Sequence, residues 1–341
     1  MAHPVPRVPK ITHHADDRRT TLSAAMPLPP LPLLIDCDPG IDDALALLLA
    51  AAAPGLALRA VTCVAGNRPV EQTAPNARRI LDLAGADGVP VYAGCARPLA
   101  QPEPRSNLVH GADGLGGVEL PLRGRVQARH AVDVIIEALQ SAPAGSLHLV
   151  ALGPLTNLAL AELRTPGLLK RAARIDIMGG AADRPGNVTP HAEFNFHCDP
   201  LAAQIVLCAG AAVQVFGLDV TSQTAMSEAW RASIAALGTP VASAAHAMLQ
   251  AYANVDPLLH DACPVAALIE PGLFGGEPRR MRVEWRDAVS EGRLVTEAPR
   301  AEPTAGDGWG RGQLITSVDN TRLLALVRDS VACLPRRIAS A

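Results

Sequence analysis

Short apolar runs and helix-forming runs alternate along most of this 341-residue chain. The runs expected to form strands span residues 31–35, 56–64, 89–92, 147–151, 175–178 and 213–218. Helices are expected at 44–53, 69–83, 131–139, 158–163, 200–207, 227–237, 241–253 and 320–334, with another after His260-Asp261 and two more strands after Met281. The strand runs are mainly apolar, as in strands buried on both faces. The pattern predicts an α/β fold, with an open, mostly parallel Rossmann-like sheet flanked by helices.

The first thirty residues differ from the rest of the chain. They carry many prolines, several charges and the pair His13-His14, and they lack the continuous apolar segment of a signal peptide. No internal repeat and no clean linker follows them. We therefore expect residues 1–30 to form a disordered or extended leader and residues 31–336 to form a single domain. Apolar residues make up 49% of the chain, which is ample for a large core.

Polar residues follow the expected strands. In open α/β sheets, ligands bind beyond the carboxyl ends of the strands. The polar residues at these positions, in chain order, are Asp36 and Asp38, Asn67, His110 and Asp113 in the long loop 94–127, Asn157, then Asn187, Glu193 and Asn195, and finally His260-Asp261 before a late helix. Their convergence predicts a ligand site at this edge of the sheet.

Four aspartates stand within eight residues: Asp36, Asp38, Asp42 and Asp43. The turn-forming pair Pro39-Gly40 folds the last two back towards the first two. Four carboxylates this close together do not all stay ionised in a partly buried turn without a cation or shifted pKa values. Ca²⁺ and Mg²⁺ prefer such oxygen ligands, so the cluster is a candidate metal site. In the alternative interpretation, Asp42 and Asp43 only stabilise a helix N-terminus.

An EF-hand does not explain the cluster. An apolar strand precedes it, and Leu47 stands at the twelfth position, where that calcium loop needs a bidentate glutamate.

Charge and cysteine usage limit the partners. The formal net charge of −3 gives no electrostatic reason to expect nucleic acid or an anionic membrane as partner. Seven cysteines, without a C-x-x-C pair, argue against a disulfide framework or a zinc ribbon. They favour a reducing compartment, and we expect a cytoplasmic protein. No apolar run reaches the ~18–20 residues of a transmembrane helix.

The residues resemble those of the nucleoside hydrolases, of the inosine-uridine preferring type. The N-terminal signature of that family is similar to Asp36-Cys37-Asp38-Pro39-Gly40-Ile41-Asp42-Asp43-Ala44. Further similar segments follow in the family's order: Val64-Ala65-Gly66-Asn67, His110-Gly111-Ala112-Asp113-Gly114-Leu115-Gly116, Leu152-Gly153-Pro154-Leu155-Thr156-Asn157-Leu158-Ala159, Met178-Gly179-Gly180, Gly186-Asn187-Val188, Ala192-Glu193-Phe194-Asn195 and His260-Asp261. The resemblance covers roughly residues 32 to 334.

The resemblance implies an N-ribosyl hydrolase of class EC 3.2.2. Such an enzyme splits ribonucleosides into ribose and free base with a calcium-bound water that an aspartate base activates. Asp38 would be that base and would also touch the Ca²⁺. Asp43, Asp261 and the carbonyl of Leu152 would ligate the ion, with Thr156 as the alternative to Leu152. Asp36 would support the site from close by. A homodimer or homotetramer is also implied.

The resemblance assigns the remaining residues to the nucleoside. The ribose hydroxyls would be held by Asp42, Asn67, Asn187, Glu193 and Asn195. Met178 would pack near the sugar, His260 would face the leaving base and His110 would lie beside it. Cleavage builds positive charge on the ribose ring, which these acidic groups would stabilise.

Four residues near these motifs leave room for another interpretation. The alternative for His260 is a residue that only orients Asp261. The alternative for His110 is a residue of a glycine-rich loop without a role in the pocket. Tyr252 is a weaker candidate for the base pocket, and a role in the core is equally open. His197 departs from the family's pattern, which often has an aromatic residue there.

Two other functions compete with this one. A haloacid-dehalogenase-like phosphatase would use Asp36 as nucleophile and Asp38 as acid/base, but it also needs a lysine. The chain has only Lys10 and Lys170, and Asp38 is followed by Pro39-Gly40 where a Gly-Thr type of continuation is expected. A non-catalytic nucleoside- or sugar-binding protein is the second alternative. Retention of Asp38 and the absence of a secretion signal argue against it.

Overall fold

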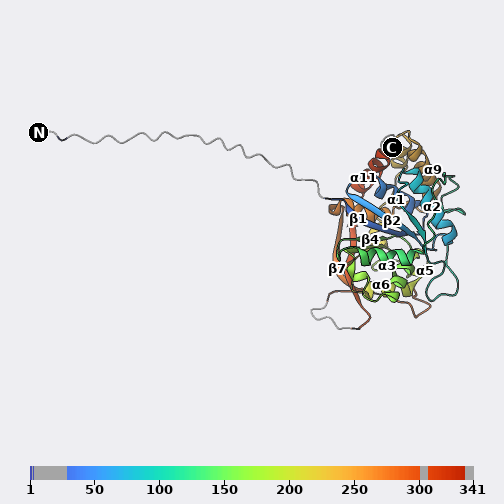
Figure 1. Ribbon diagram of the computed structural model, residues 1–341, viewed down its shortest axis with the longest axis vertical. Coiled ribbons are helices and arrows are strands. Elements are labelled where there is room, and N and C mark those ends of the chain that lie inside the picture. The colour runs from blue at the N-terminus through green and yellow to red at the C-terminus, as the bar shows by residue number, and fades with distance from the viewer. Residues whose placement is uncertain (2, 4–28, 300–305, 335–341) are drawn as a thin grey trace.

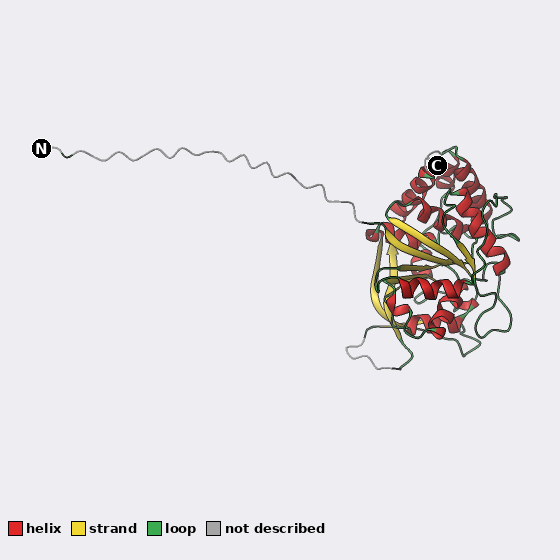
Figure 2. Cartoon of the chain, viewed as in Figure 1, coloured by secondary structure: helices red, strands yellow, loops and turns green. Residues whose placement is uncertain are grey.

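The computed structural model describes residues 1, 3, 29–299 and 306–334. The expected leader therefore lies almost wholly outside the described residues, as do residues 335–336 of the expected domain. The described part is built on a nine-stranded sheet with helices on both faces (Figures 1 and 2). This is the α/β architecture that the sequence predicts.

The strands lie in the order β3 (Val91–Ala93), β2 (Leu56–Cys63), β1 (Leu31–Cys37), β4 (His148–Ala151), β5 (Arg174–Met178), β6 (Val213–Phe216), β9 (Gly310–Val318), β7 (Phe274–Val283) and β8 (Leu294–Glu297). All neighbours from β3 to β9 pair in parallel, whereas β7 pairs antiparallel with β9 and β8. The strand order reverses direction between β1 and β4. That switch point is where ligands bind in open α/β sheets.

The helices on the two faces are α1 (Ile41–Ala52), α2 (Val70–Leu83), α3 (Ala131–Ser141), α4 (Thr156–Arg164), α5 (Phe194–Cys198), α6 (Pro200–Cys208), α7 (Leu218–Thr221), α8 (Glu228–Ala235), α9 (Pro240–Ala253), α10 (Ala262–Ile269) and α11 (Asn320–Cys333). Within the described ranges, no helix combines the length and the apolar character needed to cross a membrane.

Strand β1 separates two apolar cores. Leu33 and Ile35 point into one core together with α1, and Leu34 points into the other together with residues of α3, α4 and α6. This is why the run 31–35 shows no polar alternation. Because β1 and α1 are both buried, the aspartate-bearing turn between them is held by packing on either side.

The end of the chain differs from the expectation. Two strands, β8 and β9, follow Met281 as expected, but β7, which contains Met281, was not expected. The sequence of β7 contains Gly275-Gly276 and Pro278, which weaken the strand signal. Proline is tolerated because β8 pairs only with Arg280–Val283, so the rest of this side of β7 is a sheet edge.

Candidate active site

The turn from β1 into α1 folds back on itself through Asp43. The Asp43 carboxylate accepts the backbone N–H of Gly40 at 2.8 Å and that of Asp38 at 3.3 Å. Gly40 is required at this point, because a Cβ there would lie 2.7 Å from the imidazole of His110. The ring Nδ1 of His110 in turn accepts the backbone N–H of Ile41 at 3.0 Å. The long loop that carries His110 is thereby fastened to the start of α1.

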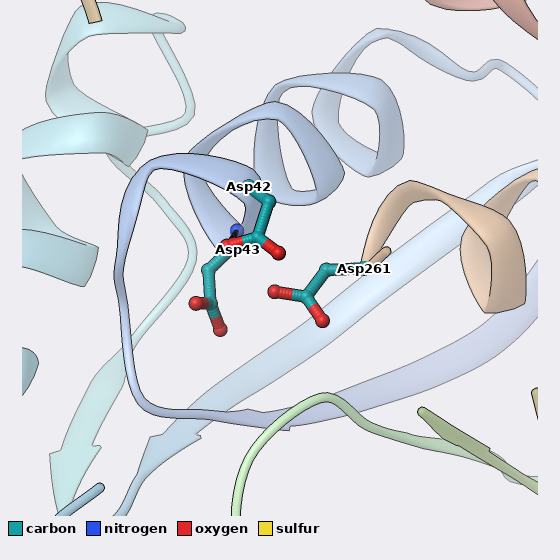
Figure 3. A group of neighbouring side chains, drawn as sticks. All are labelled: Asp42, Asp43 and Asp261. Carbon is teal, nitrogen blue, oxygen red and sulfur yellow. Dashed lines mark hydrogen bonds between the residues drawn. The ribbon is translucent and has the colours of Figure 1, made fainter. Parts of the chain in front are cut away.

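Three buried carboxylates meet at this turn. Asp42 and Asp43 come from α1 and Asp261 from the segment before α10, and the three side chains point towards one another (Figure 3). One oxygen of each lies within 4.8 Å of the others. Burial and the charge of Asp42 raise the pKa of Asp43 to about 7, and burial raises the pKa of Asp261 well above its usual range. A divalent cation would compensate the repulsion among the three carboxylates, so the cluster can hold a metal ion.

Asp38 lies next to this cluster in a slot between two glycines. Its Oδ2 accepts the backbone N–H of Asn67 at 2.6 Å, and its buried Oδ1 has no hydrogen-bond partner among the described residues. A Cβ on Gly66 or Gly153 would lie 2.1 or 2.4 Å from these oxygens. Burial, followed by the charge of Asp43, raises the pKa of Asp38 well above its usual range. An orphaned carboxylate oxygen beside three other carboxylates suits a hard cation such as Ca²⁺.

The two residues considered for a metal-ligating backbone carbonyl, Leu152 and Thr156, are placed differently. The carbonyl of Leu152 accepts the side-chain amide of Asn195 at 2.6 Å, and Leu152 lines the cavity described next. The hydroxyl of Thr156 instead donates to Asp199 at 2.7 Å. Leu152 lines the cavity and Thr156 does not, which favours the carbonyl of Leu152 as the ligand.

A cavity of about 360 Å³ opens beside the carboxylates. It is lined by Asp42, Asn67, Asn107, Val109, His110, Leu152, Met178, Asn187, Val188, Glu193, Phe194, Asn195, Tyr252, Val255, Asp256, His260 and Asp261. All the residues expected to bind substrate are in this set, whereas Asp38 and Asp43 are buried and do not line the cavity. The volume is in the range of pockets for small molecules of nucleoside size.

The far wall of the cavity is built on the first turn of α5. Glu193 caps this helix, and its carboxylate accepts the backbone N–H groups of Gly180, Asn195 and Phe196 at 2.8, 2.9 and 3.2 Å. Burial nevertheless raises its pKa. The side-chain amide of Asn195 donates to the carbonyls of Leu152, which directly follows β4, and of Met178, which ends β5. The polar groups are therefore held rigidly by the ends of the central strands.

Two aromatic rings close another side of the cavity. The ring of His110 stacks on Tyr252, with centroids 5.1 Å apart and planes at 16°. Both reach Asp42: Nε2 of His110 lies 3.7 Å from Oδ1, and the Tyr252 hydroxyl donates to Oδ2 at 3.4 Å. Tyr252, which the sequence left between the core and the pocket, is 1% exposed and lines the cavity.

Asp36, Asn157 and Asp113 were all expected to follow strands, but Asp36 lies inside β1, and none of the three lines the cavity. Oδ1 of Asp36 accepts from Thr62 at 2.6 Å and from Asn157 at 2.8 Å, which ties β1 to β2 and α4. Burial raises the pKa of Asp36 to about 7. Asp113 accepts the backbone N–H groups of Leu115 and Gly117 within its own loop. These side chains stabilise the surroundings of the site.

His197, the departure from the family's pattern, helps to anchor the long loop 94–127. Arg105 of that loop donates to the carbonyl of His197 and lies 3.2 Å from its Nδ1. The same guanidinium binds Glu291 at 2.6 Å. These contacts of Arg105 fix the loop just before Asn107, which lines the cavity and donates to Asn67 at 3.1 Å.

The sequence interpretation missed Asn107 and Asp256. Each is a polar residue close to a recognised histidine, Asn107 three positions before His110 and Asp256 four before His260. Their closeness in sequence to His110 and His260 was the only signal that could have identified Asn107 and Asp256. Both residues belong to loops whose path is given by the structure and not by the sequence pattern.

The fold and the site together define an α/β protein with a cavity for a small polar molecule beside a carboxylate cluster that could hold a metal ion. The sequence matches the family of the inosine-uridine preferring nucleoside hydrolases over residues 33–325. The chain belongs to this family, the class of enzymes that hydrolyse the N-glycosidic bond of ribonucleosides.

Named relatives and solved structures agree with this assignment. The inosine-uridine preferring nucleoside hydrolase of Leishmania major is 34% identical over 89% of this chain and 98% of its own length. The pyrimidine-specific ribonucleoside hydrolase RihA of Enterobacter sp. (strain 638) is 39% identical over 78% of this chain and 88% of its own. A plant nucleoside hydrolase structure has a TM-score of 0.83 and 31% identity, covering 89% of this chain and 99% of that one. A purine-preferring ribonucleoside hydrolase from Gardnerella vaginalis has a TM-score of 0.82 and 31% identity, covering 90% and 99%.

Proposed function

We propose that this chain splits ribonucleosides into ribose and free base, with Ca²⁺ as its metal ion and Asp38 as its general base. The observation that carries the proposal is the orphaned, buried oxygen of Asp38 next to the carboxylates of Asp42, Asp43 and Asp261. All-oxygen donors suit Ca²⁺ better than zinc, and Asp43, Asp261 and the carbonyl of Leu152 would hold the ion together with Asp38. When bound, Ca²⁺ supplies positive charge that attracts oxygen ligands and lowers the pKa of water.

The ribose would lie against the polar wall of the cavity. Each ribose hydroxyl both donates and accepts a hydrogen bond, which matches a mixed set of amides and carboxylates. Asp42, Asn67, Asn187, Glu193 and Asn195 supply that set around one cavity. Met178 offers an apolar contact for the sugar ring. A 2′-deoxy substrate would leave buried polar groups unpaired and should react far more slowly.

The chemical step would be shared between Asp38, which is buried beside the carboxylate trio, and His260, which lines the cavity. Asp38 takes the proton of the attacking water, while cleavage of the C1′–N bond leaves positive charge on the ribose ring. The carboxylates of Glu193 and Asp42 supply negative potential where that charge develops. The electron pair of the broken bond goes to the base, and His260 donates to it from the other side of the cavity. His110, which stacks on Tyr252, would lie beside the base.

The preferred base is left open, because the names of the relatives and neighbours differ on it: inosine-uridine preferring, pyrimidine-specific and purine-preferring. A reducing-sugar assay over inosine, uridine, cytidine and adenosine tests the proposal. We expect ribose release from at least one of them with Ca²⁺, loss of release with EDTA, and recovery when Ca²⁺ is added back. No release from any of the four by the folded, Ca²⁺-loaded protein would contradict the proposed function.

Phosphate release from phosphomonoesters, or tight nucleoside binding without cleavage over hours, would support the phosphatase or the binding protein instead. The homodimer or homotetramer, the cytoplasmic location and the single domain 31–336 remain parts of the proposal. Light scattering after size-exclusion chromatography tests the first of these, and limited proteolysis tests the last.

A further inference from the structure

Arg105 connects three parts of the chain. It stands in the long loop 94–127, and its guanidinium donates to the backbone carbonyl of His197 in α5. The same guanidinium binds the carboxylate of Glu291 at 2.6 Å, in the segment between β7 and β8. Glu291 is held in turn by the side-chain amide of Gln101, which donates to it at 2.9 Å. We call the contacts of Arg105 with His197 and Glu291 the Arg105 anchor.

The imidazole of His197 takes part in this anchor as a hydrogen-bond acceptor. Its Nδ1 lies 3.2 Å from the guanidinium nitrogen that also donates to the backbone carbonyl of His197. A guanidinium has only donors and stays charged, so Nδ1 must accept and the neutral ring must carry its proton on Nε2. A protonated imidazole has an N–H group on both nitrogens. It cannot accept from Arg105, and two positive charges would then face each other.

The charged groups that act on this imidazole come from two separate segments, Arg105 from the long loop and Glu291 from the segment between β7 and β8. Burial and then the charge of Arg105 lower the pKa of His197, and Glu291 offsets this only in part. At neutral pH the ring is therefore uncharged and the anchor is complete. As the pH falls through the pKa of His197, the ring gains a proton and its bond with Arg105 is lost.

The anchor lies just before the part of the loop that forms a wall of the cavity. Asn107, Val109 and His110 all line the cavity. The side chain of Asn107 accepts the backbone N–H of Val109 at 3.0 Å, so these two residues are coupled. At its other end this stretch is fastened to the start of α1 through His110. Without Arg105, Asn107 and Val109 would be held from that end and no longer from both.

We propose that Arg105 is a positioning residue for this wall of the cavity, and that protonation of His197 weakens its hold. The inference rests on the proposed function, in which the cavity binds a ribonucleoside. Asn107 and His110 would lie against the bound nucleoside and not at the bond that breaks. Loosening them therefore weakens the binding of substrate and of transition state alike, which raises KM and leaves kcat nearly unchanged.

The test measures kcat and KM for the best ribonucleoside with Ca²⁺, at about pH 7.5 and about pH 5.5, on either side of the usual range for histidine. His197→Asn places an amide oxygen near the position of Nδ1, so it offers Arg105 an acceptor that does not titrate. Arg105→Met keeps an unbranched side chain and removes the guanidinium. Arg164→Met is the matched control, because Arg164 is half-exposed, pairs with Asp133 and does not line the cavity.

We expect Arg105→Met to raise KM about 10-fold at both pH values, the order of a lost hydrogen bond to a charged group, with kcat within about 3-fold of wild type. The KM of wild type divided by that of His197→Asn should rise about 5-fold from the higher to the lower pH, since one bond of the anchor is lost. Effects of pH on all other groups are common to both proteins and cancel in this ratio. Arg164→Met should follow the wild type throughout.

Hydrogen–deuterium exchange of the loop gives a second measurement that does not depend on turnover. At the lower pH the backbone amides of residues 105–110 should exchange faster in wild type than in His197→Asn, and at the higher pH they should exchange alike. Equal exchange at the lower pH, or a KM ratio that does not change with pH, would overturn the role of His197.

A wild-type KM in Arg105→Met would overturn the role of Arg105. A fall in its kcat as large as the rise in its KM would do the same, because a positioning role in binding does not slow the chemical step. Failure of the proposed function looks different: no ribonucleoside is then cleaved by the wild type, whereas the pH-dependent difference in exchange remains.

Discussion

The backbone N–H of Asn67 donates a 2.6 Å hydrogen bond to Oδ2 of Asp38. This bond joins the segment after β2 to the turn after β1, which are neighbouring strands of the sheet. It turns the other oxygen of Asp38 towards Gly153, where it has no partner among the described residues. The glycines on either side of the carboxylate thus help to hold Asp38, the proposed base, in place.

Replacement of Gly66 by alanine should displace Asp38. The new Cβ would lie 2.1 Å from Oδ2 and 2.8 Å from Cγ of Asp38, far inside van der Waals contact. A shift of the base by even ~1 Å is enough to cost about 100-fold in rate. We expect kcat on the best nucleoside to fall by about that factor in Gly66→Ala.

Gly55→Ala is the matched control, since a Cβ there has nothing within 4 Å. It should retain wild-type kcat and melting temperature. Wild-type kcat in Gly66→Ala would show that catalysis does not depend on the position of Asp38 between Gly66 and Gly153, or that Asp38 is not the base.

Asp38→Asn should abolish most of the turnover and leave binding in place. The amide keeps an oxygen for the N–H of Asn67, but it cannot take a proton from water. General-base catalysis is worth 10²–10⁴-fold, so we expect kcat to fall about 1,000-fold while KM changes little. Steady-state kinetics gives kcat and KM, and calorimetry with substrate confirms binding. Normal turnover by this variant would remove Asp38 from the mechanism.

Removal of the metal should destabilise the protein as well as inactivate it. Asp42, Asp43 and Asp261 are buried at 5%, 0% and 3% exposure, so their repulsion is poorly screened without a cation. A ligand at about 100 times its Kd stabilises the folded state by about 2.7 kcal/mol. We therefore expect the melting temperature to rise on addition of Ca²⁺ to EDTA-treated protein, in differential scanning calorimetry.

The variant Asp261→Asn provides the comparison. It removes one carboxylate of the trio and should reduce both the affinity for Ca²⁺ and the Ca²⁺-dependent rise in melting temperature. Asp133→Asn, an exposed substitution elsewhere, should respond to Ca²⁺ like the wild type. An equal rise in all three proteins would place the stabilising ion somewhere other than this cluster.

The parallel sheet was predictable because its strands are buried on both faces. The runs that became β1 and β2 are mainly apolar for that reason, and the polar residues near their carboxyl ends were expected to converge at the switch point. The antiparallel strand β7 was not predictable in the same way. It carries glycines and a proline at a sheet edge, so its pairing with β9 depends on the tertiary fold.

The site was predictable where residues stand in motifs and less so where loops bring them in. Asp42 shows the limit: the sequence assigned it to the ribose, whereas the structure also puts it in the carboxylate trio and between His110 and Tyr252. Asp256 shows another limit of prediction from sequence, since its hydrogen bond with His260 depends on the path of the loop before α10. Periodicity contains no information on such contacts.

A last prediction concerns stability away from the active site. Asp176 lies in β5 with a fully buried side chain, and Arg174 binds it at 2.8 Å. Burial outweighs this ion pair and raises the pKa of Asp176 from 3.8 to about 6. Between these two values the folded state binds more protons at this carboxyl than the unfolded state does, so its contribution to stability falls as pH rises through that window.

Asp176→Asn removes this titration while keeping the size of the side chain. Relative to wild type, the free energy of unfolding of the variant should therefore become larger, that is, the variant should become relatively more stable, from about pH 4 to about pH 7. A shift of about 2 pKa units corresponds to at most about 3 kcal/mol, at about 1.36 kcal/mol per unit. Urea unfolding of both proteins at the two pH values measures this difference directly, and effects of pH on all other groups cancel in the comparison. A difference that stays the same at both pH values would show that Asp176 titrates alike in the folded and unfolded chains.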